Sequence, residues 1–310
     1  MPPKPHKKGF DKRNLWPWCD WMTIGIGVLA TSPEGRKENR RPDTAILIAD
    51  TMGSYGSVDS HPRLHKAFIF EKAGMYAVAA DQIDRAGELL AAIEQAILVI
   101  PKAERTHGEL TRTVAAVCYG YKRGKFTTHE FPKLRLPPQE IDPTTVTPAL
   151  NAIVQERWEN FSIGCDLVLA IFTAGKTPTL MQVNGAEHEL GNMMFPGFAA
   201  IGVGAEHAVF WLSRRQQMFG YVPLRAAYHA YEAKIMAESS PHVNEHLDII
   251  VATDNEQWYS STHRIDHRFP EHPEINIKNL QRMWKKYSTR DTSNVGLGEI
   301  EIKRASRRSV

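Results

Sequence analysis

Strand-forming and helix-forming segments occur in blocks along this chain, and that order limits the folds open to it. Short apolar runs rich in β-branched residues or alanine, bounded by turn residues, indicate strands. A block of strands precedes helices, and a second block of strands again precedes helices and a last strand. Strands are expected at residues 22–30, 43–50, 66–74, 75–80, 166–175, 179–185, 197–204 and 246–253. The pattern predicts an α+β fold, a four-layer αββα sandwich in which helix pairs cover two facing antiparallel sheets.

Helices are expected where apolar residues recur every three or four positions. The clearest case is residues 81–101, where Leu89, Ile93 and Ile97 lie on one helical face and Pro101 ends the pattern. Further helices are expected at residues 107–124, 144–161, 205–219, 223–239 and 275–288. The polar stretch from Ser32 to Pro42 has turn residues at both ends and no apolar period, so it is expected to be a loop.

Composition excludes several classes of protein. The chain has 310 residues, 42% hydrophobic and 24% charged, as in globular proteins. A net charge of +3 is too small to imply a nucleic-acid partner, and no run of about 18 apolar residues predicts a membrane span. The cysteines Cys19, Cys118 and Cys165 lie far apart, which fits a reducing compartment. We therefore expect a cytoplasmic protein with neither a nucleic acid nor a membrane as partner.

A metal site is not expected either. His242 and His246 have a spacing that suits a helix face, but they lie just before and at the start of a predicted strand and lack the order of a zinc-protease motif. The sequence thus predicts no metal and no cofactor.

An aspartate and a lysine frame the most informative stretch. "AILIADTMGSYG" places Asp50 at the end of a strand with Gly56 six residues later, and Lys66 follows Asp50 by 16 residues. This pattern resembles the proteasome β-subunit branch of the N-terminal nucleophile (Ntn) hydrolases, which has an aspartate in such a context and a lysine at the same separation. The resemblance continues through "FIFEKAGMYAVAADQIDRA" and returns at "AAIGVGAEHA".

The resemblance implies a threonine nucleophile, and Thr23 is the candidate. Thr23 precedes Asp50 by 27 residues, and the excess of 11 over the family's spacing equals the length of the Ser32–Pro42 stretch. In this family the free α-amino group of the threonine serves in proton transfer from its hydroxyl. A lysine that is oriented by an aspartate supplies positive charge that favours the alkoxide, and the resemblance gives these roles to Lys66 and Asp50. The backbone N–H at Ala80 would bind the oxyanion. Lys66→Ala would abolish turnover and leave the fold intact.

The resemblance implies a peptide or another amide as substrate, but the family's pocket positions do not identify it and suggest only tolerance for apolar groups. These positions correspond to Gly53, Leu64, Phe68, Val78 and Gln82.

Departures from the family pattern keep a second function open. Met22 stands where the family usually has glycine, and Val203 where active members commonly have a serine. Thr23 could become terminal by autocleavage after Met22, or Met22 could be the true start of translation. The alternative is a catalytically inactive Ntn-fold subunit that forms a ring or scaffold.

The resemblance also implies a homo-oligomer, with a ring as one form, and aromatic residues on the later helices at the interfaces: Trp211, Phe219 and Tyr231. Three parts of the chain are expected. Residues 1–22 are an N-terminal extension or propeptide, residues 23–253 the Ntn-hydrolase-like αββα domain, and residues 254–310 an extension with one helix and a basic tail.

Overall fold

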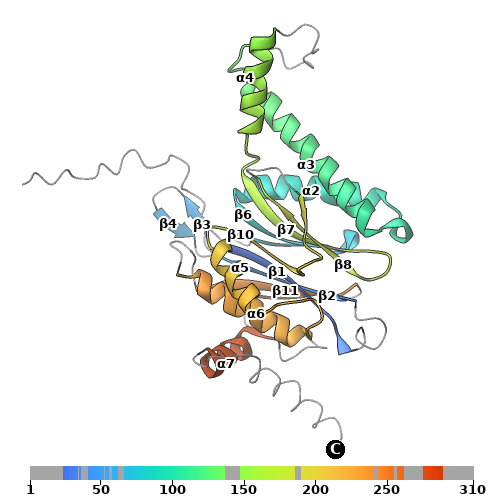
Figure 1. The fold of residues 1–310 in the computed structure, drawn as a ribbon, viewed down its shortest axis with the longest axis vertical. Coiled ribbons are helices and arrows are strands. Elements are labelled where there is room, and N and C mark those ends of the chain that lie inside the picture. The colour runs from blue at the N-terminus through green and yellow to red at the C-terminus, as the bar shows by residue number, and fades with distance from the viewer. Residues whose placement is uncertain are drawn as a thin grey trace, which may run out of the picture.

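A computed structural model gives the fold, which consists of helices and antiparallel sheets (Figure 1). The structure describes residues 24–33, 35, 41–51, 53–55, 58–61, 66–136, 147–185, 190–239, 243, 245–254, 257–261 and 275–288. Two of the sheets have five strands each. The expected mixture of helices and two antiparallel sheets is therefore confirmed.

The first five-stranded sheet takes its strands from both halves of the chain. Their order is β10-β1-β2-β11-β12, and every neighbouring pair is antiparallel. The bounds are β1 (Ile24–Ala30), β2 (Thr44–Asp50), β10 (Phe198–Gly202), β11 (Leu247–Ala252) and β12 (Gln257–Ser261). Every residue of β1 and β2 is buried, as expected for strands covered on both faces.

The second five-stranded sheet uses strands in sequence order, β5-β6-β7-β8-β9, again all antiparallel. The bounds are β5 (Ala67–Phe70), β6 (Met75–Asp81), β7 (Cys165–Phe172), β8 (Pro178–Val183) and β9 (Leu190–Asn192). Gly74 closes the β5–β6 hairpin at a φ of 62°, a left-handed conformation that favours glycine.

A single buried cluster contains side chains from both sheets, among them Leu47 of the first sheet and Val168 of the second. Gly27 of β1 faces this cluster, and a Cβ atom there would come within 2.6 Å of the Val168 Cγ1 atom. Only glycine leaves room for the neighbouring sheet here, and this accounts for a glycine inside a buried strand.

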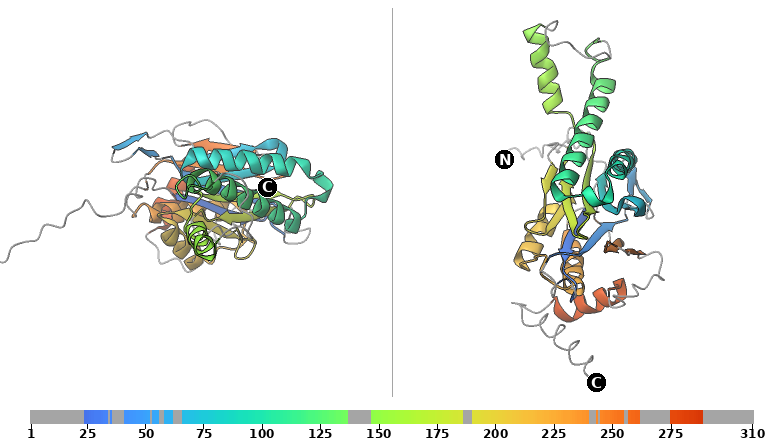
Figure 2. Two further views of the ribbon diagram at one scale, coloured as in Figure 1. Left: turned by 90° about the horizontal axis from the view of Figure 1, so that it is seen from above. Right: turned by 90° about the vertical axis from the view of Figure 1, so that its right-hand side faces the viewer.

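Helices pack on the opposite faces of the sheets. α2 (Ile83–Val99) and α3 (His107–Glu130) pack against the second sheet, while α5 (Ala205–Arg214), α6 (Pro223–Ala237) and α7 (Ile277–Tyr287) share a core with the first. The predicted apolar stripe of α2 is buried, whereas α6 is buried on nearly all sides. α4 (Pro148–Glu159) has no buried residue and, with the adjoining half of α3, projects beyond the sheets (Figure 2).

Several elements were not predicted. A hairpin of β3 (Gly53–Tyr55) and β4 (Val58–His61) lies between Asp50 and Lys66. The strand β12 was not predicted either, and it pairs with β11. The predicted helix α7 contacts α6, so residues after position 253 pack against the elements before it. The division at residues 22 and 253 remains a prediction. Among the described residues, no helix is both long enough and apolar enough to cross a bilayer.

Candidate active site

Asp50 and Lys66 come from different sheets and meet where their strands end and begin. Asp50 is the last residue of β2, and Lys66 directly precedes β5. The carbonyl oxygen of Lys66 accepts a hydrogen bond of 3.0 Å from the N–H of Ala79, which fixes the lysine backbone to β6. Both Asp50 and Lys66 are 0% exposed.

One carboxylate oxygen organises the site. The Oδ1 atom of Asp50 accepts a hydrogen bond from the Nζ atom of Lys66 at 2.9 Å and from the backbone N–H of Ile24 at 3.2 Å. Its Oδ2 atom has no hydrogen-bond partner among the described residues. Asp50 therefore holds the lysine amine beside the first peptide nitrogen of β1.

Burial shifts both members of this ion pair toward their neutral forms. Loss of hydration raises the pKa of Asp50, while the charge and hydrogen bond of Lys66 and the Ile24 N–H oppose that rise. Burial also lowers the pKa of Lys66, against the opposing charges of Asp50, Asp248 and Asp81. The charge of Asp50 and its hydrogen bond thus favour the ammonium form of Lys66 against the effect of burial.

Two further charged residues at the site were not predicted. Asp248 of β11 is fully buried, faces Ala49 in the strand register and acts on Lys66. Lys234 of α6 is also fully buried, donates a hydrogen bond to Glu238 and acts electrostatically on Asp50. An acid inside the apolar run "LDIIVA" was a usable signal for Asp248. No pattern marked Lys234, because α6 is buried almost all round and has no polar face to contrast with it.

Asp81 ends β6 at a φ of 68°, a left-handed conformation uncommon for residues other than glycine. Burial first, and then the charge of Asp166, raises the pKa of Asp81 to about 7, while Lys66 acts in the opposite direction. Above neutral pH the carboxylate would bring negative charge next to Ala80, the predicted oxyanion donor.

The other residues that the sequence predicted for the site do not all lie together in the structure. Ala80 is buried on β6 and pairs in register with Asp166 of β7, and Gln82 precedes α2. Phe68 packs toward the helices whereas Val78 packs between the sheets, so these two predicted pocket residues lie on opposite faces of one sheet. Gly53 lies in β3. Thr23 and Leu64 lie outside the described residues.

In the part of the chain that the structure describes, no three histidine, cysteine or acidic side chains are grouped so that they could hold a metal ion. His242 lies outside that part.

No protein-family model and no curated protein matches the sequence. The fold is similar to that in the crystal structure of eukaryotic HslV from Trypanosoma brucei, with a TM-score of 0.48 and 16% sequence identity. The match covers 74% of this chain and 99% of the HslV chain. A likeness this slight assigns neither an activity nor an assembly to the present chain.

Proposed function

We propose that this chain is a proteasome-like threonine hydrolase that cleaves peptide or other amide bonds, with Thr23 as its N-terminal nucleophile. The observation that supports this proposal is the shared Oδ1 atom of Asp50, which contacts the Lys66 amine and the Ile24 N–H. Thr23 is bonded to that Ile24 nitrogen. The candidate nucleophile therefore precedes, in the chain, the residue whose N–H is bound by Asp50.

Each group has a chemical task in this proposal. The Thr23 hydroxyl attacks the substrate carbonyl, and its proton passes to the free α-amino group and then to the leaving amine. The charge of Lys66 stabilises the alkoxide, and Asp50 holds Lys66 in place. The resulting ester between Thr23 and the acyl group is released by water. The backbone N–H of Ala80 is the proposed oxyanion donor.

The proposal extends to the architecture and the assembly. We propose the four-layer αββα sandwich of the Ntn hydrolases, because one buried cluster lies between the sheets and one lies under the helices on each outer side. A homo-oligomer, with a ring as one form, and a cytoplasmic location are part of the same proposal.

An inactive subunit that builds a ring or scaffold is the second candidate. Asp81 favours it, because an ionised carboxylate beside Ala80 would repel an oxyanion. Val203 favours it as well, because valine offers no hydroxyl to bind the α-amine of Thr23.

Processing and labelling separate the two functions. Native protein should be sequenced from its N-terminus, and material proved to begin at Thr23 should be treated with a peptide epoxyketone. The hydrolase requires covalent label on Thr23 and none on the Thr23→Ala variant. Unlabelled protein that begins at Thr23, or a mature chain that retains the residues before it, would leave the scaffold as the function.

A further inference from the structure

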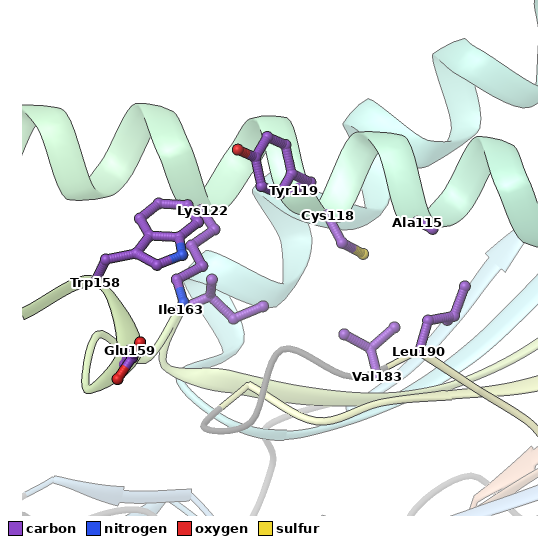
Figure 3. A pocket seen from close by; sticks show the side chains of 9 residues that line it. All are labelled: Ala115, Cys118, Tyr119, Lys122, Trp158, Glu159, Ile163, Val183 and Leu190. Atoms are coloured by element: carbon purple, nitrogen blue, oxygen red, sulfur yellow. The ribbon is translucent and has the colours of Figure 1, made fainter. Parts of the chain in front are cut away.

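A cavity of about 580 Å³ lies between α3, α4 and the β8–β9 edge of the second sheet (Figure 3). This volume is in the range of small-molecule sites. None of its lining residues belongs to β1 or β2 or surrounds the Asp50–Lys66 pair. A ligand here would contact none of the residues that we assign to the hydrolase chemistry.

The two ends of the cavity differ in chemistry. Lys122, Trp158 and Glu159 lie at one end, and apolar side chains, including Val183 and Leu190, lie at the other (Figure 3). The thiol of Cys118 lies between them. Burial raises the pKa of that thiol to about 12, so it stays protonated and is part of the wall instead of acting as a nucleophile.

Lys122 is the feature that selects a ligand. The residue is only 3% exposed, and its Nζ atom lies 4.1 Å from the centre of the Trp158 ring. Among the described residues, no carboxylate lies within ion-pair distance of this amine. Burial lowers the pKa of Lys122 to about 8, with Glu159 opposing the change from further away. Its ammonium form thus has N–H donors available but little hydration, which makes the buried charge unfavourable. An anion bound here would accept these hydrogen bonds and compensate for the lost hydration.

The residues around Lys122 favour an anion with a single negative charge. A single lysine can neutralise one negative charge, and Glu159 at the same end would repel a second. The far end offers Ala115, Val183 and Leu190, which favour an apolar tail and give no partner to a second polar group.

We propose that this cavity binds an amphipathic monocarboxylic acid, with the carboxylate paired to Lys122 and the apolar tail directed toward Ala115, Val183 and Leu190. The face of the Trp158 ring contacts the lysine amine, so the carboxylate would approach that amine from a side away from the ring face.

Octanoate is the probe, with octan-1-ol and octylammonium as matched neutral and cationic ligands. Isothermal titration of the full chain should give an octanoate dissociation constant on the order of 100 µM. The alcohol and the ammonium should bind at least about tenfold more weakly, because a hydrogen bond to a charged group contributes about 1.5–3 kcal/mol.

Variants then separate the contributions of the ligand's head group and of its tail to the affinity. Lys122→Met should weaken octanoate at least about tenfold and leave octan-1-ol unchanged, since the loss concerns the ion pair alone. Lys122→Arg should retain octanoate binding. Lys125→Met removes a positive charge that pairs with Glu88 outside the cavity, and it should leave both ligands unaffected. Ala115→Trp, at an exposed position on the rim, should obstruct both.

Three results would overturn the proposal. They are no octanoate binding to the folded chain, equal affinities for octanoate and octan-1-ol, and unchanged octanoate affinity in a Lys122→Met variant with the wild-type circular dichroism spectrum.

Discussion

Lys66 has no contact with solvent, and this changes the expected effect of replacing it. Lys66→Ala would leave the buried carboxylate of Asp50 without its cation, so we expect this variant to be less stable, whereas the sequence alone suggested an intact fold. We expect a loss of about 3–5 kcal/mol in the free energy of unfolding. Urea denaturation measures this loss for Lys66→Ala and for the single variants Asp50→Asn and Lys66→Met.

The double variant Asp50→Asn/Lys66→Met serves as the control, because it removes both charges. It should be more stable than the sum of the single effects predicts. Additive losses would show that the two groups do not depend on each other. Activity tests of Lys66 variants should therefore be made on protein shown to be folded.

Asp81 should make stability depend on pH. Its folded-state pKa of about 7 is above the ordinary value of 3.8, so the folded state binds the proton more tightly than the unfolded state does. The stabilisation is full below about pH 4 and is lost as pH rises through 7. At pH 8, Asp81→Asn should raise the free energy of unfolding by up to about 4 kcal/mol, since one pKa unit corresponds to about 1.4 kcal/mol.

Asparagine suits this test because it tolerates the left-handed backbone and keeps the shape of the side chain. Urea denaturation at pH 5 and pH 8 should show a smaller pH effect for Asp81→Asn than for the wild type. Equal pH effects in the two proteins would mean that Asp81 does not titrate in this range.

At the scale of the elements, the packing of β1 against the second sheet requires that residue 27 has no side chain. In Gly27→Ala the new methyl group would come within 2.6 Å of Val168, and one of the sheets would have to move. We expect a loss of about 1–3 kcal/mol in the free energy of unfolding.

Gly87 on α2 is the matched control, because a Cβ atom there meets nothing within 4 Å. Gly87→Ala should stabilise the protein by about 0.5–1 kcal/mol through helix propensity. Thermal unfolding of both variants compares the same chemical change in two environments. A Gly27→Ala variant as stable as wild type would argue against the close approach of the sheets.

The sequence predicted the helices and strands whose buried apolar residues form a regular pattern, and it missed the strands that have no such pattern. α2 was predictable from its apolar stripe, and β2 from its continuous apolar run. β9 was not, because a three-residue strand containing glycine gives no period. β3 and β4 are similarly short. Helix α3 continues past Gly124, where the sequence suggested its end, to Glu130.

The candidate site was only partly predictable for a different reason. Spacing along the chain cannot show that Asp50 and Lys66 meet, since they belong to different sheets, and only the family resemblance joined them. Lys234 reaches the site from α6 by tertiary packing, which no local pattern encodes.

At the scale of the whole molecule, self-association remains a proposal with a defined surface to test. Tyr231, which the sequence suggested for an interface, is buried in the core at 4% exposure. On α5, Val209 and Phe210 are 40% and 59% exposed. Exposed apolar side chains of this kind are common at interfaces between subunits.

Light scattering at micromolar concentration should therefore detect an oligomer. Phe210→Asp should shift it toward the monomer, because a charge at an apolar interface is costly to bury. Lys285→Asp, on the outer side of α7, is the control. A wild-type monomer under these conditions would contradict the assembly.

The order of strands in the two sheets has a consequence for synthesis. The strands of the second sheet follow one another in the sequence, whereas β10 is made about 170 residues after β1, and β11 about 200 residues after β2. At roughly 5–20 residues per second, β1 and β2 therefore lack these two partners for about 8–40 s on the ribosome. During this interval the nascent chain carries two of its most apolar strands without β10 and β11 beside them, and we expect this to be the period when it depends most on chaperones.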